Sequence, residues 1–181
     1  MAAQTVHMKS LEGKIAVVAG GSRGAGRGIA LALGEAGAIV YVAARTSKDG
    51  PKPSDGAPGT VEETAAMVTA RGGEGIPVPA DLSEKQQVAA LFERIKRERR
   101  RLDILANSAW GADCMAVWSK RFWELEIELW QETLRTVSVG WLTSVYAARL
   151  MVKQGQGLIV HVDGRYIPIF DPKAPVQEFP C

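Results

Sequence analysis

A glycine-rich stretch near the N-terminus holds residues that could bind a phosphate group. Gly20, Gly24 and Gly26 follow the spacing G-x-x-x-G-x-G, between an apolar run and a segment of helical periodicity. A nucleotide pyrophosphate needs backbone N–H groups at a helix N-terminus, where the macrodipole and the unpaired donors favour an anion. It also needs a close approach of the backbone, which a Cβ would obstruct. The stretch therefore predicts a dinucleotide-binding turn, although its spacing differs from the strict G-x-G-x-x-G pattern.

Cations follow the second apolar run, where the ribose of a bound dinucleotide would be recognised. Sites that prefer NAD place an acidic side chain there, whereas a cation suits the 2′-phosphate of NADP. This sequence has Arg45 at that point, with Arg23 in the glycine-rich stretch and Lys48 nearby. A guanidinium makes paired, charge-assisted hydrogen bonds to phosphate. We therefore expect NADP(H) to be preferred over NAD(H); the alternative is that Arg45 is only a solvated residue at the end of a strand.

Five short apolar runs alternate with segments of helical periodicity. Runs of this kind, rich in β-branched residues, are typical of strands buried on both faces of a parallel sheet. A turn and cap over Asp81-Leu-Ser83-Glu84 should precede the third helix. The alternation predicts an α/β fold, a doubly wound parallel sheet with helices on both faces. The predicted strands cover residues 14–19, 38–44, 75–80, 102–107 and 157–162, and the predicted helices lie around 29–33 and over 61–70, 85–97 and 127–153.

Two segments show neither the apolar pattern of a strand nor the periodicity of a helix. Residues 46–59 hold three prolines and three glycines and predict an irregular surface loop. Residues 164–181 hold four prolines and predict an irregular tail. A buried strand at 157–162 should be followed by further layers, so the sheet is expected to be incomplete at its C-terminal side. Because a domain averages about 150 residues, residues 1–181 are expected to form a single dinucleotide-binding domain.

The composition argues against several classes of protein. Lys and Arg number 22 against 20 Asp and Glu, a net charge of +2 that does not favour nucleic-acid binding. The basic run 94–101 is interpreted as a helix C-terminus whose cations complement the macrodipole, with phosphate-backbone binding as the alternative. Two cysteines without a C-x-x-C pair and two histidines predict no disulfide framework and no metal site. With no signal-peptide core and no apolar run of roughly 20 residues, we expect a soluble, cytoplasmic protein without a membrane partner.

Several motifs in register resemble the short-chain dehydrogenase/reductase family. They are the turn Gly20–Gly26 with Ser22 and Arg23 inside it, Asp81-Leu82, the segment 102–109 and the segment 144–160. The long loop and the helix before the last strand are most similar to the dehydrogenase/reductase member-one subgroup. The resemblance implies a Rossmann-like fold and an NAD(P)-dependent oxidoreductase that transfers hydride between NADP(H) and a small carbonyl or alcohol substrate.

The resemblance also implies roles for particular residues. The three glycines of the turn would shape the pyrophosphate site. Asp81 would accept a hydrogen bond from the adenine amino group, and Leu82 would pack on the adenine ring. Asn107 would steady the fourth strand beside the cofactor. The complete set implied for cofactor binding is Gly20, Ser22, Arg23, Gly24, Gly26, Arg45, Asp81, Leu82 and Asn107.

The catalytic residues of the family have no counterpart in residues 1–181. Hydride transfer to a carbonyl needs a proton donor, which the family supplies with a Tyr and a Lys four residues later. The residues four positions after the three tyrosines are Arg45, Leu150 and Phe170. Asp163, at the end of the last predicted strand, is a weak substitute candidate, and His161 is expected to be packed in that strand.

Two functions are therefore compatible with the sequence. The chain is either an N-terminal portion of an NADP-dependent oxidoreductase or a non-catalytic dinucleotide-binding or interaction module. In the family, the long helix at 127–153 commonly forms a dimer interface, so a homo-oligomer is expected. An unpaired edge on the last strand would also favour self-association.

Overall fold

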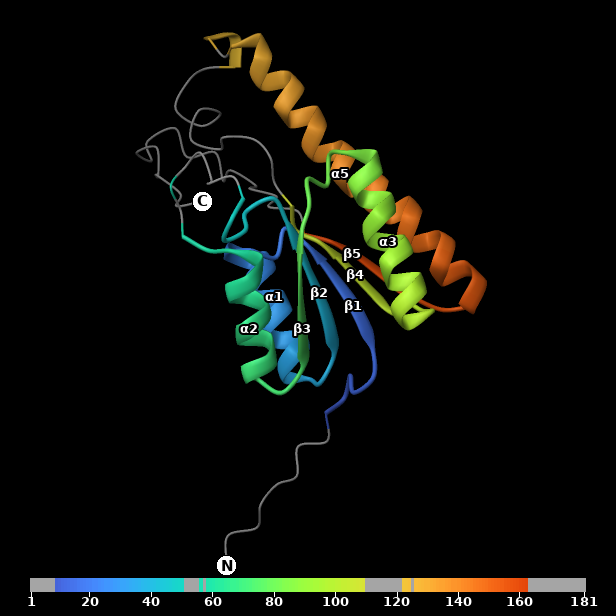
Figure 1. Cartoon of the computed structure of the whole chain (residues 1–181). Coiled ribbons are helices and arrows are strands. Elements are labelled where there is room, and N and C mark those ends of the chain that lie inside the picture. Colours follow the sequence, from blue (N-terminus) through green and yellow to red (C-terminus); the bar gives the residue numbers. More distant parts are fainter. Residues whose placement is uncertain (1–8, 51–55, 57, 110–121, 125, 163–181) are drawn as a thin grey trace, which may run out of the picture.

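Five parallel strands form the central sheet of the computed structural model, in the order β3-β2-β1-β4-β5 (Figure 1). The structure describes residues 9–50, 56, 58–109, 122–124 and 126–162. The strands are β1 (Ile15–Ala19), β2 (Ile39–Ala44), β3 (Glu74–Pro79), β4 (Ile104–Asn107) and β5 (Leu158–His161). The helices are α1 (Gly24–Glu35), α2 (Val61–Ala70), α3 (Lys85–Arg99) and α5 (Ile127–Gln154), with a short 3-10 helix η1 (Phe122–Glu124).

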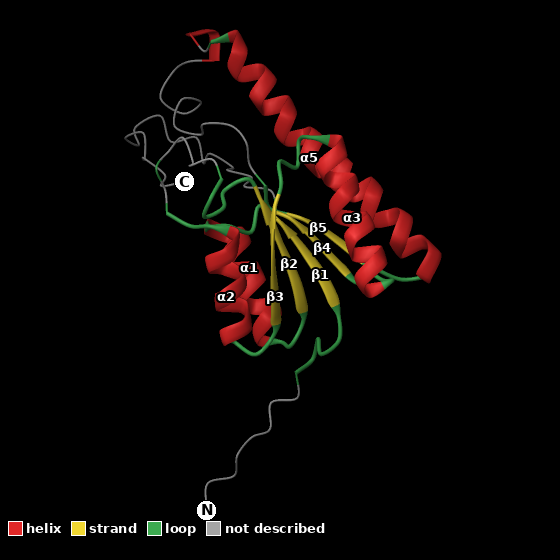
Figure 2. Ribbon diagram, viewed as in Figure 1, coloured by secondary structure: helices red, strands yellow, loops and turns green. Residues whose placement is uncertain are grey.

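Helices cover both faces of this sheet (Figure 2). Side chains alternate between the two faces of a strand, so each strand contributes to two cores. Along β1, Ile15 and Val17 pack with the core under α3 and α5, whereas Ala16 and Val18 pack with the core under α1 and α2. All four are at most 4% exposed. The prediction of a doubly wound parallel sheet is confirmed.

The strand register brings the carboxyl ends of neighbouring strands to one edge. Ala19, the last residue of β1, pairs with Ala43 of β2 and with Asn107 of β4. Pro79 at the end of β3 pairs with Ala44, and Asn107 pairs with His161 of β5. The segments that leave these strands therefore begin side by side, which is where ligands bind in open α/β sheets.

Local sequence explains the helix starts to different degrees. Thr60 caps α2 in a reciprocal capping box: its hydroxyl accepts the Glu63 N–H at 3.1 Å and the Glu63 carboxylate accepts the Thr60 N–H at 3.3 Å. The prediction of a turn and cap over Asp81–Glu84 is confirmed in position: the Glu84 N–H donates to the Asp81 carbonyl at 3.1 Å, and Glu84 is the N-cap of α3, although its side chain forms no cap hydrogen bond. The Asp81 carboxylate accepts the N–H and hydroxyl of Ser83 within this turn.

The basic run 94–101 ends α3. Lys96, Arg97 and Arg99 lie in its last turn, and Arg100 ends the helix in the left-handed conformation. Lys96 pairs with Glu93 at 3.3 Å, and Arg99 forms an ion pair with Glu74 on β3. This arrangement agrees with the interpretation of the run as a helix C-terminus whose cations complement the macrodipole.

Strand β5 lies at an edge of the described sheet. Leu158 is 55% exposed, Val160 is 40% exposed and His161 is also exposed. The prediction of a buried last strand with a packed His161 is therefore wrong for the described residues, because β5 has a hydrogen-bonded neighbour on one side only, β4. The expectation of an apolar, exposed edge there is confirmed.

Asp103 joins β1 to the start of β4. Its Oδ2 atom accepts the Ile15 N–H at 2.9 Å and Arg101 Nε at 3.1 Å, and Lys14 Nζ lies 3.6 Å from Oδ1. Burial alone would raise the pKa of this carboxyl, but the hydrogen bonds from Arg101 and Ile15 and the charge of Lys14 hold the pKa below its ordinary value. The carboxylate thus contributes stability that is fully present above its unfolded pKa and is lost as the pH falls through its folded pKa.

We expect Asp103→Asn to lower the free energy of unfolding by about 1–3 kcal/mol at neutral pH, because one acceptor and one buried charge are lost. The variant should also lose less stability than the wild type below the ordinary aspartate pKa of about 4. Urea unfolding at several pH values measures both effects. Asp49→Asn, at an exposed position, is the control. Equal pH dependence in Asp103→Asn and the wild type would contradict this role.

Candidate functional site

The predicted site residues follow the carboxyl ends of the strands. Gly20 comes directly after β1, Arg45 after β2, and Asp81 two residues after β3, and Asn107 is the last residue of β4. The Gly20 N–H donates to the Ala43 carbonyl at 2.8 Å and the Ser108 N–H donates to the Ala19 carbonyl at 2.8 Å. Residues from four strands are thus brought to one edge of the sheet.

The three glycines of the turn meet different surroundings. A Cβ on Gly20 would lie 2.6 Å from the backbone of Ala109, and a Cβ on Gly26 would lie 2.1 Å from the Gly20 carbonyl oxygen. Gly24 has a φ of +55° and would meet nothing within 4 Å. Gly20 and Gly26 therefore allow the chain to pack on itself, and only Gly24 faces open space. From the sequence, all three glycines are predicted to allow the close approach of a ligand.

The N-terminus of α1 is suited to an anion. Its N-cap residue, Arg23, is extended and forms no side-chain cap hydrogen bond, and the first turn contains no acidic residue. The first N–H groups of a helix have no partner within the helix. Gly24 and Ala25 are exposed there. The geometry fits a pyrophosphate, which would accept from these N–H groups while the helix dipole favours its charge.

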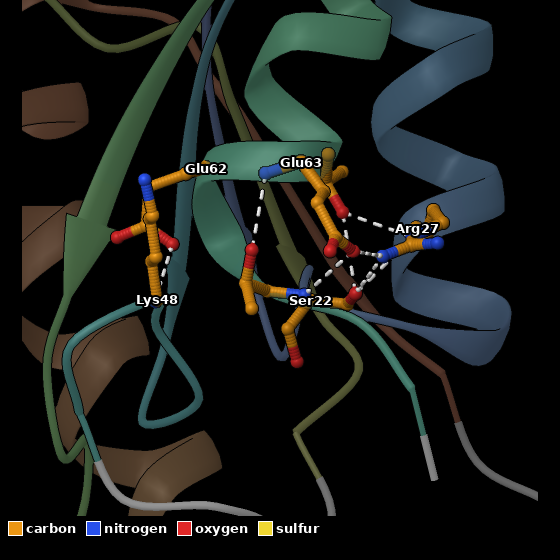
Figure 3. A network of polar contacts seen from close by, with 7 residues as sticks. Ser22, Arg27, Lys48, Glu62 and Glu63 are labelled. Atoms are coloured by element: carbon orange, nitrogen blue, oxygen red, sulfur yellow. Dashed lines mark hydrogen bonds and ion pairs between the residues drawn. The ribbon is translucent and has the colours of Figure 1, made fainter.

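Arg45 begins the segment that leads into α2. It is exposed, and the residues after it are held in place. The Val61 N–H donates to the Thr46 carbonyl at 3.1 Å, and the Lys48 main-chain N–H donates to the Glu62 carboxylate at 2.9 Å (Figure 3). The cationic segment is therefore anchored on the first turn of α2 at both Thr46 and Lys48.

Asp81 is an ionised acceptor at the same edge. Partial burial would raise the pKa of this carboxyl, but hydrogen bonds from the Ser83 hydroxyl (2.7 Å) and N–H (2.9 Å), with the charges of Arg45 and Arg135, hold the pKa below its ordinary value. Leu82 is only 3% exposed and packs in the core with residues of α3. The predicted contacts of Asp81 and Leu82 with adenine stay predictions.

Asn107 connects β4 to α5 through a buried network. Its Oδ1 atom accepts the Thr143 hydroxyl at 2.7 Å, and its Nδ2 atom donates to Ser144 Oγ at 3.2 Å. Ser144 Oγ lies 3.1 Å from Nε2 of His161. A Cβ on Gly140 would come within 3.2 Å of the His161 ring, so the glycine leaves room for that ring. The network runs from a buried amide to an exposed imidazole on β5.

The sequence does not predict Thr143, Ser144 and His161 as members of this network. The available signal is small polar residues within the mostly apolar part of α5 at 137–147, but their partner depends on how α5 lies over β4. Asp163, the weak catalytic candidate, lies outside the described residues.

The described tyrosines do not reach the site edge. The Tyr41 hydroxyl donates to Glu98 on α3 at 2.7 Å, and the Tyr146 ring stacks on Phe92 of α3 with centroids 6.0 Å apart. Tyr41 is buried in the core under α3 and α5, and Tyr146 is partly buried and packs against that core. Within the described residues, no three His, Cys, Asp or Glu side chains are grouped so that they could hold a metal ion. None of the described helices is long and apolar enough to cross a membrane.

Sequence comparison identifies relatives over most of the chain. A family model described as short chain dehydrogenase matches residues 14–165. Dehydrogenase/reductase SDR family member 1 from Mus musculus is 40% identical over 156 residues, covering 84% of this chain and 46% of that protein. The protein of the same name from Homo sapiens is 39% identical, covering 83% of this chain and 46% of its own length. The chain thus spans about half the length of these curated relatives.

Solved structures show the same fold. A metagenomic short-chain oxidoreductase in complex with NADP matches with a TM-score of 0.71 and 26% identity, covering 92% of this chain and 66% of that one. A short-chain type dehydrogenase/reductase from Mycobacterium marinum matches with a TM-score of 0.69 and 31% identity, covering 85% of this chain and 57% of that one.

Proposed function

Since the chain belongs to the short-chain dehydrogenase/reductase family of NAD(P)-dependent oxidoreductases, we propose that it binds NADP(H) at the carboxyl edge of its sheet. The protein would transfer hydride between NADP(H) and a small carbonyl or alcohol substrate. The observation that carries the proposal is that the N-terminus of α1, where Arg23 forms no side-chain cap hydrogen bond, and the exposed Arg45 follow the carboxyl ends of the paired strands β1 and β2. The dinucleotide supplies the hydride, and the chain supplies binding and orientation.

Each part of the cofactor has a candidate partner at this edge. The pyrophosphate would accept from N–H groups of the turn shaped by the three glycines. Ser22, Arg23 and Arg45 would bind the 2′-phosphate, where a guanidinium offers a rigid fork of donors. Asp81 and Leu82 would hold the adenine. Asn107 would fix β4 through its contacts with Thr143 and Ser144.

A fluorescence titration of the 181-residue chain with NADPH and NADH tests this proposal. One charge-assisted contact to the 2′-phosphate is worth about 1.5–3 kcal/mol, so NADPH should bind about 10–100-fold more tightly. Equal affinities would refute the cofactor preference. Absence of binding to either dinucleotide would refute the proposed function.

A non-catalytic dinucleotide-binding module is the second candidate. It is favoured by the positions of the described tyrosines, since Tyr41 is buried in the core and Tyr146 is partly buried and packs against it. This candidate predicts NADPH binding without reduction of a panel of carbonyl compounds by the chain. Measurable turnover would contradict it and favour the enzyme.

We also propose that the chain self-associates through α5 and β5. Val137, Trp141 and Val152 of α5 are 66%, 71% and 78% exposed, and Leu158 of β5 is 55% exposed. Apolar surface of this kind marks interaction sites. Sedimentation velocity at increasing protein concentration should show dimers or larger species, and a monodisperse monomer would contradict this expectation.

A further inference from the structure

The carbonyl oxygen of Ser22, inside the glycine-rich turn, accepts hydrogen bonds from three donors. Arg27 donates from Nε at 3.1 Å and from Nη2 at 2.8 Å, and the Thr64 hydroxyl donates at 3.2 Å. Arg27 Nε also lies 3.0 Å from Thr64 Oγ1. Arg27 comes from α1 and Thr64 from α2, so two helices fix one peptide group of the turn (Figure 3).

The first turn of α2 makes further contacts with the cluster formed by Ser22, Arg27 and Thr64. The Glu63 carboxylate lies 3.2 Å from Arg27 Nη2. Its neighbour Glu62 accepts the Lys48 N–H. A Cβ on Gly59 would lie 2.5 Å from the Ser22 carbonyl oxygen and 2.6 Å from Arg27 Nη2, so the chain entering α2 passes directly against this cluster. Adjacent residues of one helical turn therefore hold both the glycine-rich turn and the segment after Arg45.

The contacts determine how the turn presents its next N–H group. A trans peptide is planar, and its carbonyl oxygen and N–H point in opposite directions. Holding the Ser22 oxygen toward α2 therefore directs the Arg23 N–H away from α2. The Arg27 guanidinium adds charge to two of the three hydrogen bonds, which strengthens them relative to neutral ones.

We propose that the first turn of α2 positions two cationic segments of the cofactor site, Ser22–Arg23 and Arg45–Lys48, relative to each other. Arg27 and Glu63 are the positioning residues, and their contacts set the preference for NADP(H). This inference rests on the proposed function. A 2′-phosphate must be reached from the Ser22–Arg23 turn and from the Arg45–Lys48 segment together. A ribose that carries only hydroxyl groups requires no such alignment, so looser positioning weakens NADPH binding more than NADH binding.

Two substitutions separate this role from general stability. Arg27→Lys keeps the positive charge but removes the planar fork that holds the Ser22 oxygen. Glu63→Gln removes the ion pair with Arg27, while glutamine still serves in a capping box and preserves the start of α2. Glu35→Gln is the matched control, because Glu35 pairs with Arg71 at 3.6 Å across the opposite ends of the same two helices.

The experiment measures dissociation constants for NADPH and NADH by fluorescence titration of the 181-residue chain and the three variants. Arg27→Lys should raise the NADPH constant about tenfold, equivalent to one charge-assisted hydrogen bond, and Glu63→Gln about threefold. The NADH constant should change by less than about twofold, so that the ratio of the two constants falls toward one. Glu35→Gln should leave that ratio unchanged.

The possible results distinguish this inference from the proposed function. If the wild type prefers NADPH and the variants keep its ratio, or if both constants rise by the same factor, the positioning role is refuted and the proposed function stands. If the wild type binds both cofactors equally, the proposed preference itself is refuted. If circular dichroism shows that Arg27→Lys does not fold, the ratio of the NADH to the NADPH dissociation constant of Glu63→Gln decides whether the positioning role holds.

Discussion

Replacing Gly26 with alanine is expected to abolish NADP(H) binding and to lower the free energy of unfolding by about 1–3 kcal/mol. The new Cβ would lie 2.1 Å from the Gly20 carbonyl oxygen and 2.8 Å from its carbon. Both atoms belong to the backbone of the turn, so no flexible side chain can move aside. Relief of the clash requires α1 to shift away from β1, which displaces the N–H groups expected to hold the pyrophosphate. Urea unfolding and NADPH titration measure the two effects.

Two other glycines of α1 are controls for this substitution. Gly28→Ala places a Cβ with nothing within 4 Å, so the variant should bind NADPH normally and gain about 0.5–1 kcal/mol from the better helix propensity. Gly24→Ala also meets open space but must adopt a φ of +55°, which costs about 1–2 kcal/mol. If Gly26→Ala were as stable and as active in binding as Gly28→Ala, the packing role of Gly26 would be wrong.

Arg45→Asp is expected to reverse the cofactor preference. The substitution removes the cation proposed to bind the 2′-phosphate and introduces an acid that accepts from ribose hydroxyls. Loss of a charge-assisted contact of about 1.5–3 kcal/mol should weaken NADPH binding about 10–100-fold, with repulsion adding to it, while NADH binding improves. Because Arg45 is exposed at the end of β2, the fold should be unaffected. Parallel titrations with the two cofactors measure the reversal.

Lys153→Asp is the control for net charge. It makes the same change in charge on the last turn of α5, at the opposite edge of the sheet. Only long-range electrostatics should act there, and these are screened beyond about 10 Å at 0.1 M salt. An equal loss of NADPH affinity in both variants would show that Arg45 acts through overall charge rather than through contact.

Much of the fold could be predicted because local signals agree with tertiary structure. The prediction of a helix over 61–70 is confirmed at both bounds, and in the structure Thr60 and Glu63 form the capping box that starts this helix. Continuous apolar runs placed β1 and β2 within one residue at each end because both faces of the sheet are covered. Burial of the last strand was predicted wrongly from the same kind of run, because an apolar sequence does not specify how many neighbours a strand has.

The candidate site was predictable in its location and less so in its internal contacts. The order of strands and the family resemblance, which the comparisons confirm, place Gly20, Arg45 and Asp81 at one edge. The packing functions of Gly20 and Gly26 depend on which backbone crosses them in the folded state. The contacts of Ser22 with α2 likewise join residues 42 positions apart, and no spacing rule connects them.

An NMR titration of the isotope-labelled 181-residue chain with NADPH, followed through its backbone amide signals, tests the proposed dinucleotide site most directly. We expect the largest shifts at residues 20–26, 45–48 and 81–83, which follow three separate strand ends. NADH should produce smaller shifts at 45–48, because it lacks the 2′-phosphate. Shifts confined to other elements, or no shifts at saturating NADPH, would contradict the assignment of a dinucleotide site to this edge.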